Sequence, residues 1–153
     1  MIGFPQATPY PSENHGARRN CAAPDLLVLH YTAMETAKEA LERLCSSDHE
    51  VSAHYLIPAS GEVFQLVSED RRAWHAGRSY WAGHRDVNSR SIGIELDNNG
   101  SVPFSVPQFF ALVGLCHDIF QRWSIPQWRV VAHSDIAIGR KVDPGFRFDW
   151  SGL

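Results

Sequence analysis

The 153-residue sequence lacks the features that mark membrane, nucleic-acid-binding and disulfide-rich proteins. No uninterrupted apolar run approaches the roughly 20 residues that span a bilayer. The formal net charge of −3 leaves no basic excess for a nucleic-acid partner. The three cysteines, Cys21, Cys45 and Cys116, are scattered and form no C-x-x-C pair, which indicates buried thiols in a reducing compartment. There is no internal repeat and no low-complexity segment.

The composition is that of one globular domain, with 44% hydrophobic and 20% charged residues. We expect residues 1–24 to be an irregular segment that packs on a domain formed by residues 25–153. The segment Met1–Arg19 has prolines but no apolar h-region, so it is not a signal peptide. This predicts a cytoplasmic location if the chain is complete as given, and a periplasmic or cell-envelope location if a leader has been removed.

Strand and helix patterns alternate along the chain. Apolar runs bounded by turn residues predict strands at 25–32, 54–57, 62–67, 92–96 and 128–132. Capping-box patterns at 36–39 and 105–108 start two helices with apolar stripes. Residues 68–91 show no periodicity, and residues 146–153 resemble a short aromatic anchor. The intermixed elements predict an α/β (α+β mixed) fold, with a mixed central β-sheet flanked by α-helices.

Two of the eight histidines stand out because each ends an apolar strand. His30 follows the first strand and His133 the last, and Asp143 comes ten residues after His133. Two imidazoles and one carboxylate suit zinc, and three protein ligands leave a position open for water. A structural zinc site would need a fourth protein ligand, and no other residue in the sequence stands out as a candidate for it.

Two charged residues near this set have alternative interpretations. Glu95 interrupts an apolar strand, so it is either half of a buried ion pair with an arginine or a general base beside the metal. Its apolar neighbours favour the general base. Lys141 is either a solvated loop lysine or, because it lies two residues before Asp143, a group that stabilises an oxyanion.

The aperiodic stretch 68–91 is rich in aromatic and arginine side chains. Trp74, His75 and Ala76 belong either to plain core packing or to the wall of a sugar or peptide cleft. Arg78 and Arg85 either pair with carboxylates of a ligand or are solvated surface charges.

Five ordered motifs together resemble one family. They are Leu29-His30-Tyr31-Thr32-Ala33, Val51-Ser52-Ala53-His54-Tyr55-Leu56-Ile57, Arg72-Ala73-Trp74-His75-Ala76-Gly77, Ser91-Ile92-Gly93-Ile94-Glu95-Leu96, and Ala132-His133-Ser134-Asp135-Ile136-Ala137 with Lys141-Val142-Asp143-Pro144-Gly145. The chain resembles the type-2 N-acetylmuramoyl-L-alanine amidases, which are related to the peptidoglycan-recognition proteins, and within them the bacterial AmiD- and AmpD-like enzymes. The resemblance runs from about Asp25 to Trp150.

The resemblance implies one zinc ion per chain, bound by His30, His133 and Asp143, with Glu95 as the catalytic carboxylate and Lys141 stabilising the tetrahedral intermediate. It implies hydrolysis of the amide between the lactyl group of N-acetylmuramic acid and L-alanine of the stem peptide. The expected partners are peptidoglycan fragments, including 1,6-anhydro-muropeptides, and we expect a monomer. The expected substrate contacts are Tyr31, His54, Trp74, His75, Ala76, Arg78 and Arg85.

Two further expectations follow from the resemblance. The short link between Cys45 and Val51 is similar to AmiD-like enzymes and favours a broad range that includes ordinary muropeptides. The missing signal peptide is more similar to the cytosolic recycling enzymes. The alternative function is a muropeptide-binding module without catalysis, since some relatives bind and do not cut. The presence of all five implied metal and catalytic residues favours the enzyme.

Overall fold

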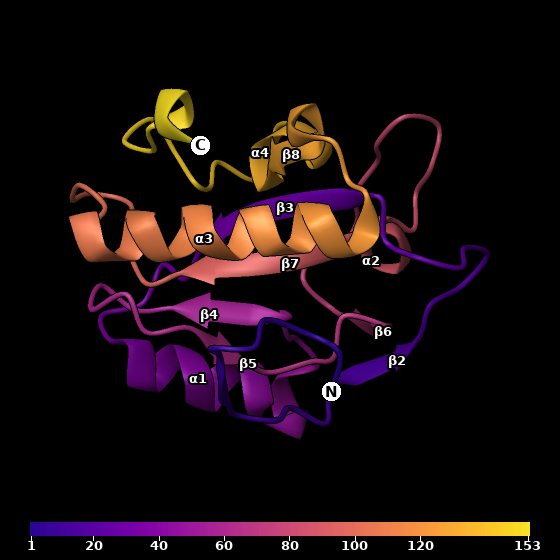
Figure 1. Ribbon diagram of the computed structural model, residues 1–153, viewed down its shortest axis with the longest axis horizontal. Coiled ribbons are helices and arrows are strands. Elements are labelled where there is room, and N and C mark those ends of the chain that lie inside the picture. The colour runs from indigo at the N-terminus through magenta and orange to yellow at the C-terminus, as the bar shows by residue number, and fades with distance from the viewer.

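Six strands form the main sheet in the order β1-β5-β4-β7-β3-β8, in a computed structural model that describes residues 1–153 (Figure 1). The strands of this sheet are β1 (Thr8–Pro9), β3 (Leu26–Tyr31), β4 (Tyr55–Ile57), β5 (Phe64–Gln65), β7 (Ser91–Leu96) and β8 (Val130–Ala132). The four strands β4, β7, β3 and β8 run parallel, and β5 turns back antiparallel to β4. The sheet is therefore mixed, as the sequence predicted.

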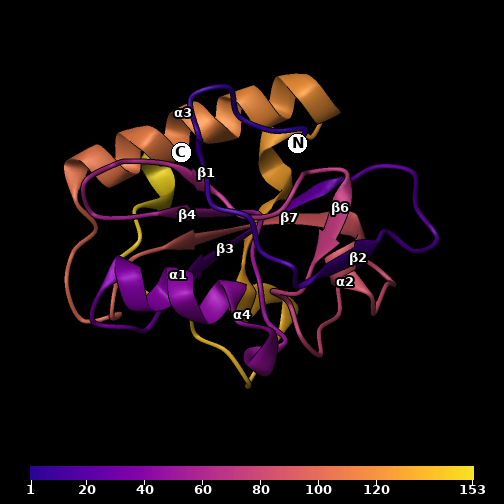
Figure 2. The same ribbon diagram turned by 90° about the horizontal axis from the view of Figure 1, so that it is seen from below.

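Helices cover both faces of the sheet. Figure 2 shows α3 (Val106–Trp123) on one side, and α1 (Ala37–Cys45) and the short α4 (His133–Ile136) on the other. The alternation of side chains along β3 explains this arrangement, because successive residues of a strand point to opposite faces. Leu27 and Leu29 pack in the core beneath α3, whereas Leu26 and Val28 belong to the core on the opposite side. His30 continues the second series, so it reaches the face that α3 does not cover.

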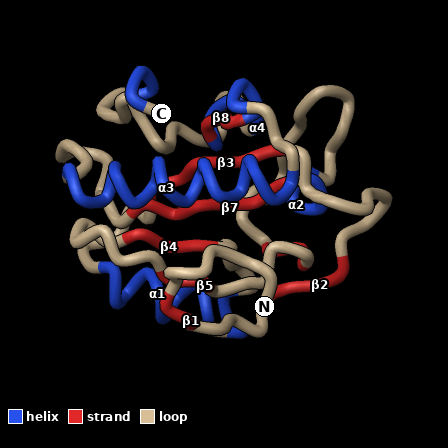
Figure 3. Tube along the Cα trace, in the orientation of Figure 1, coloured by secondary structure: helices blue, strands red, loops and turns tan.

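Strand β7 also points alternate residues to opposite faces, but its face away from α3 has no apolar side chain. Ile92, Ile94 and Leu96 join the core under α3. The alternate positions are Ser91, Gly93 and Glu95, and none of them carries an apolar side chain. The tube in Figure 3 shows β7 in the interior of the sheet, with a strand on either side of it. A central strand thus has one apolar face and one polar face.

Both helix starts follow the sequence signals. Thr36 caps α1 with a complete capping box to Glu39. Ser105 caps α3 by accepting from the Gln108 backbone N–H, but the Gln108 side chain does not close the box. It donates instead to the backbone carbonyls of Ile57 and Asp97, which ties the helix to the end of β4.

Several boundaries differ from the sequence expectations. Residues 1–24 are not wholly irregular, because β1 pairs with β5 and β2 (His15–Ala17) pairs with β6 (Arg71–Ala73). These strands have two or three residues, too few for a periodic pattern to emerge. The stretch 68–91 likewise contains β6 and a one-turn helix, α2 (Val87–Arg90). Strand β8 begins at Val130, after a 3-10 turn at Gln127–Arg129.

The C-terminal segment is anchored by one aromatic side chain. Phe148 is 5% exposed and stacks edge-on against Phe104 and Trp150. Phe146 is exposed and lies outside this contact. None of the helices combines the length and the apolar character that crossing a bilayer requires.

Candidate metal centre

The chemistry-bearing residues meet where three adjacent parallel strands end. His30 lies near the end of β3 and is the register partner of Glu95 on β7. His133 is the first residue of α4 and directly follows β8, the other neighbour of β3. Ligand sites of α/β sheets form at this carboxyl edge. Asp143 arrives from the loop after α4, which is held in place because the Ser134 N–H donates to the Asp143 carbonyl.

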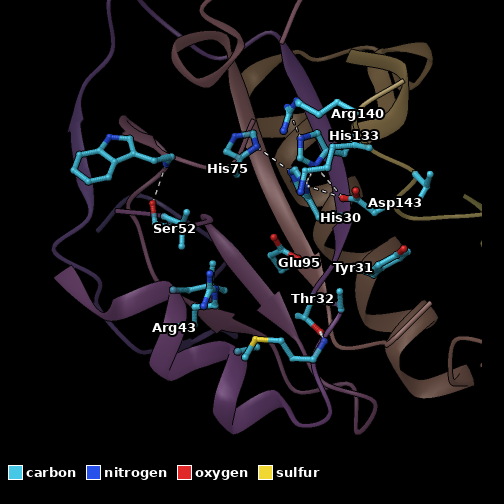
Figure 4. Close-up of a pocket in the computed structure, with 18 residues that line it drawn as sticks. His30, Tyr31, Thr32, Arg43, Ser52, His75, Glu95, His133, Arg140 and Asp143 are labelled. Atoms are coloured by element: carbon cyan, nitrogen blue, oxygen red, sulfur yellow. Dashed lines mark hydrogen bonds and ion pairs between the residues drawn. The ribbon is translucent and has the colours of Figure 1, made fainter. Parts of the chain in front are cut away.

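Three side-chain atoms converge on one point (Figure 4). The Nδ1 atoms of His30 and His133 are 2.9 Å apart, and the Asp143 Oδ2 lies 3.2 Å from the first and 3.0 Å from the second. All three residues are buried. No other group of three or more metal-ligating side chains in the chain comes together in this way.

The tautomer of His133 indicates that this cluster binds a cation. Its Nε2 lies 3.2 Å from the Ala76 carbonyl, an acceptor, and 3.4 Å from the Arg140 Nη2, whose two hydrogens are already donated to the carbonyls of Ala76 and Arg78. Nε2 therefore carries the proton and Nδ1 presents a lone pair. That lone pair faces the carboxylate oxygen of Asp143 across 3.0 Å. Two acceptor atoms at this distance repel each other unless a cation lies between them. Two nitrogen donors and one oxygen donor fit zinc, with an open fourth position.

The surroundings keep the ligands in their binding forms. Burial lowers the pKa of His30 to about 4, so the imidazole is neutral. Burial alone would raise the pKa of Asp143, but the two neighbouring imidazoles of His133 and His30 outweigh this and hold the pKa well below the usual range. The carboxyl group is therefore ionised at neutral pH.

Glu95 has the properties of a proton-transfer group. Its Oε2 is buried and has no hydrogen-bond partner. Burial, and then the charge of Asp143, raise the pKa of this carboxyl to about 8, and Lys141 opposes the shift. The first alternative from the sequence, a buried ion pair with an arginine, does not occur: no salt bridge involves this residue.

A cavity of about 380 Å³ opens beside the three ligand atoms. Glu95 and Lys141 both line it, and so do Tyr31, Trp74 and His75. The sequence predicted these last three as substrate contacts, and the structure brings them to the wall of the same cavity.

The other four predicted contacts lie elsewhere. His54 is fully buried, accepts from the Gly93 N–H and bonds the Arg71 carbonyl, so it supports the strands behind the cavity. Ala76 is also fully buried. Arg78 and Arg85 line a second cavity of about 660 Å³ and not the first.

Sequence reasoning missed two arginines that line the cavity. Arg43, on the exposed side of α1, contributes a positive charge opposite the ligand cluster (Figure 4). Arg140 donates to the carbonyls of Ala76 and Arg78 and so ties the loop after α4 to the stretch after β6. Arg140 adjoins Lys141 in sequence, but Arg43 had no sequence signal because its helix position is ordinary.

A buried His-His-Asp cluster with an open side, a carboxyl of raised pKa and a lysine is typical of metal-dependent hydrolases. Comparison with known proteins narrows the class. A family model described as N-acetylmuramoyl-L-alanine amidase matches residues 20–146, and the chain belongs to this family.

Individual relatives agree with the family match. The chain is 43% identical over 144 residues to the N-acetylmuramoyl-L-alanine amidase AmiD of Escherichia coli, covering 84% of this chain and 51% of that protein. It is 35% identical over 158 residues to the 1,6-anhydro-N-acetylmuramyl-L-alanine amidase AmpD of Enterobacter cloacae, covering 92% of this chain and 84% of the relative. The chain thus spans about half the length of AmiD and most of AmpD.

Solved structures show the same fold. A crystal structure of a selenomethionine derivative of AmpD superposes with a TM-score of 0.90 at 29% identity, covering 99% of this chain and 97% of the other. The complex of E. coli AmiD with anhydro-N-acetylmuramic acid-L-Ala-D-γ-Glu-L-Lys gives a TM-score of 0.77 at 42% identity, covering 86% of this chain and 57% of that one. The predicted mixed sheet between helices is therefore confirmed.

Proposed function

We propose that this chain is a zinc-dependent amidase that cleaves the bond between the lactyl group of N-acetylmuramic acid and L-alanine in peptidoglycan fragments. One observation carries the proposal: a His-His-Asp donor set, an unpartnered carboxyl group and a lysine share one cavity. The family match and the names of the relatives support the same activity.

His30, His133 and Asp143 would hold the zinc ion. When bound, zinc supplies a Lewis acid for a carbonyl oxygen and lowers the pKa of water towards neutrality. Its positive charge would also lower the pKa of Glu95 from about 8, which brings this carboxyl into the range of a general base at neutral pH.

Glu95 and Lys141 would carry the remaining chemistry. The Glu95 carboxylate accepts a proton from the attacking water, whose oxygen bonds to the lactyl carbonyl carbon. Lys141 donates to the oxygen that becomes negative in the tetrahedral intermediate. As the C–N bond breaks, Glu95 returns its proton to the nitrogen of L-alanine. The new carboxyl group then passes its own proton to the amine, and the products are a lactyl carboxylate and a peptide ammonium group.

The charge of the cavity fits an acidic stem peptide. Arg43 and Lys141 are exposed cations on its wall. The peptide in the AmiD complex carries D-γ-Glu, whose free α-carboxylate is a negative charge two residues from the scissile bond. We propose 1,6-anhydro-muropeptides of this kind as substrates, together with ordinary muropeptides.

The test measures release of L-Ala-D-γ-Glu-L-Lys from the anhydro-muropeptide by the purified chain. We expect release with zinc, none after chelation, and recovery when zinc is added back. A Glu95→Gln variant should bind zinc and release no peptide. If the zinc-loaded, folded wild type binds the muropeptide without cleaving it, the chain is the non-catalytic binding module and the amidase proposal fails.

A further inference from the structure

The outer side of the ligand cluster is an ordered series of hydrogen bonds that begins at Ser91. The Ser91 Oγ lies 2.7 Å from the Val87 carbonyl, which can only accept, so the single hydroxyl proton is donated there. The same Oγ lies 3.0 Å from the Nε2 of His75. Because its proton is already committed, the hydroxyl must accept from His75.

The direction of the next bond follows. His75 carries its proton on Nε2, so its Nδ1 is an acceptor. This Nδ1 lies 3.0 Å from the Nε2 of His30, which must therefore donate. The proton of His30 is thereby fixed on Nε2, and the lone pair on Nδ1 faces the ligand cluster. One serine hydroxyl and one histidine thus determine the tautomer of His30, although neither of them belongs to the ligand cluster.

The backbone of β7 is shaped to hold His75 in this position. A Cβ built at Gly93 would lie 2.4 Å from the Cγ of His75, so only glycine leaves room for the ring. The ring is 8% exposed and stacks edge-on against His30 at 5.0 Å between centroids. Ser91 and Gly93 thus support His75 from the same face of the strand that carries Glu95.

The adjacent residue performs the same task for the second ligand. The Ala76 carbonyl accepts from the Nε2 of His133, and the Arg140 guanidinium fixes this carbonyl with a bond of 2.8 Å. Two consecutive residues, 75 and 76, therefore orient both histidines with their Nδ1 atoms inward.

We propose that His75 is a positioning residue that holds the metal ligand His30 in its Nε2–H tautomer, with Ser91 and Gly93 as its support. The inference rests on the proposed function, because the oriented lone pair serves a bound zinc ion. It changes the role expected for His75 from a substrate contact to a group that acts through another residue. Outer partners of this kind contribute about 10–100-fold to metal affinity.

Two matched variants test the proposal. His75→Asn keeps an acceptor oxygen near the position of Nδ1, whereas His75→Leu has nearly the same shape as asparagine and no acceptor. We expect His75→Leu to weaken zinc binding by about 10–100-fold and His75→Asn to stay within a few-fold of wild type. The zinc dissociation constant is measured by competition with a chromogenic chelator. An equal loss in both variants, or none in His75→Leu, would overturn the proposal.

A second measurement needs no metal and no activity. Long-range ¹H–¹⁵N correlation spectra of the metal-free wild type report which nitrogen of each imidazole carries the proton. We expect the Nε2–H tautomer for both His30 and His75, and a proton on the Nδ1 of His30 would refute the inference even if zinc binds. If the wild type binds zinc but cleaves no muropeptide, the proposed function fails, while the spectra and the affinities still decide the role of His75.

Discussion

Replacing Glu95 by glutamine should stabilise the metal-free protein while it removes activity. The carboxyl has a pKa of 4.5 in the unfolded chain and about 8 in the fold, because burial disfavours its charged form. A group whose pKa is raised by folding contributes stability below its unfolded pKa, and the contribution is lost as the pH rises towards the folded value. Glutamine has nearly the same shape and no ionisation, so it avoids this loss.

The size of the effect follows from the two pKa values. At about 1.4 kcal/mol per pKa unit, the wild type at pH 7 has lost about 3 kcal/mol of folding free energy relative to low pH, and at pH 5 about 1 kcal/mol. Partial exposure of the side chain reduces the first figure to about 2 kcal/mol. Glu95→Gln should therefore be more stable than wild type by about 2–3 kcal/mol at pH 7 and by 1 kcal/mol or less at pH 5.

Urea unfolding of both proteins with a chelator present, at pH 5 and pH 7, measures this difference. All other titratable groups are the same in the two proteins, so the difference between variant and wild type isolates Glu95. A stability difference that does not grow between pH 5 and pH 7 would refute the argument that burial raises the pKa of Glu95. A less stable variant at pH 7 would refute it more directly.

Three further changes test other parts of the structure. Lys141→Met should lower kcat on the anhydro-muropeptide by about 10²–10³-fold with a much smaller change in KM, because the lysine acts on charge that develops in the transition state; a change in KM alone would assign it to substrate binding. Glu69→Gln should cost about 2–3 kcal/mol in urea unfolding, because the fully buried carboxylate is paired with Arg122, whereas the neighbouring Asp118→Asn, at a more exposed position, should cost less than half as much. Gly93→Ala should lower both the melting temperature and the zinc affinity, because its Cβ would meet His75 at 2.4 Å. The matched control is Gly114→Ala on the exposed side of α3, where a Cβ meets nothing within 4 Å, and it should stabilise the protein slightly. Equal effects at the two glycines would contradict the steric argument.

The functional residues at the strand ends could be predicted because the apolar runs beside them in the sequence mark their positions. His30 and His133 each follow an apolar run, and Glu95 is a charge inside one. The strand β3 and the starts of α1 and α3 were predicted close to where they lie, since a long apolar run and a capping pattern are both local signals. The strands β1 and β2 have two and three residues and depend on partners more than 45 residues away, so no local pattern could indicate them.

The roles of the supporting residues could be recognised only from the folded structure. Ser91 and Gly93 are ordinary strand residues until β7 is aligned beside β3 and the ring of His75 is seen against them. His54 belongs to a motif of the family, yet it points into the strands and not into the cavity. Pairwise register and the direction of each proton cannot be obtained from spacing along the chain.

We expect the polar face of β7 to decide which layer of the molecule opens first. Its α3 side joins a core of 14 buried residues, whereas its other side offers no apolar contact at Ser91, Gly93 or Glu95. Helix α1 packs instead on β4, in a smaller core of 7 buried residues. Subglobal opening follows the distribution of buried apolar contacts. The layer of α1 and the ligand loops should separate from the sheet while α3 remains attached, so amide hydrogens of α1 should exchange faster than those of α3. The three ligands join β3 to the segments after β8. Bound zinc should therefore slow amide hydrogen exchange mainly in the layer of α1 and the ligand loops.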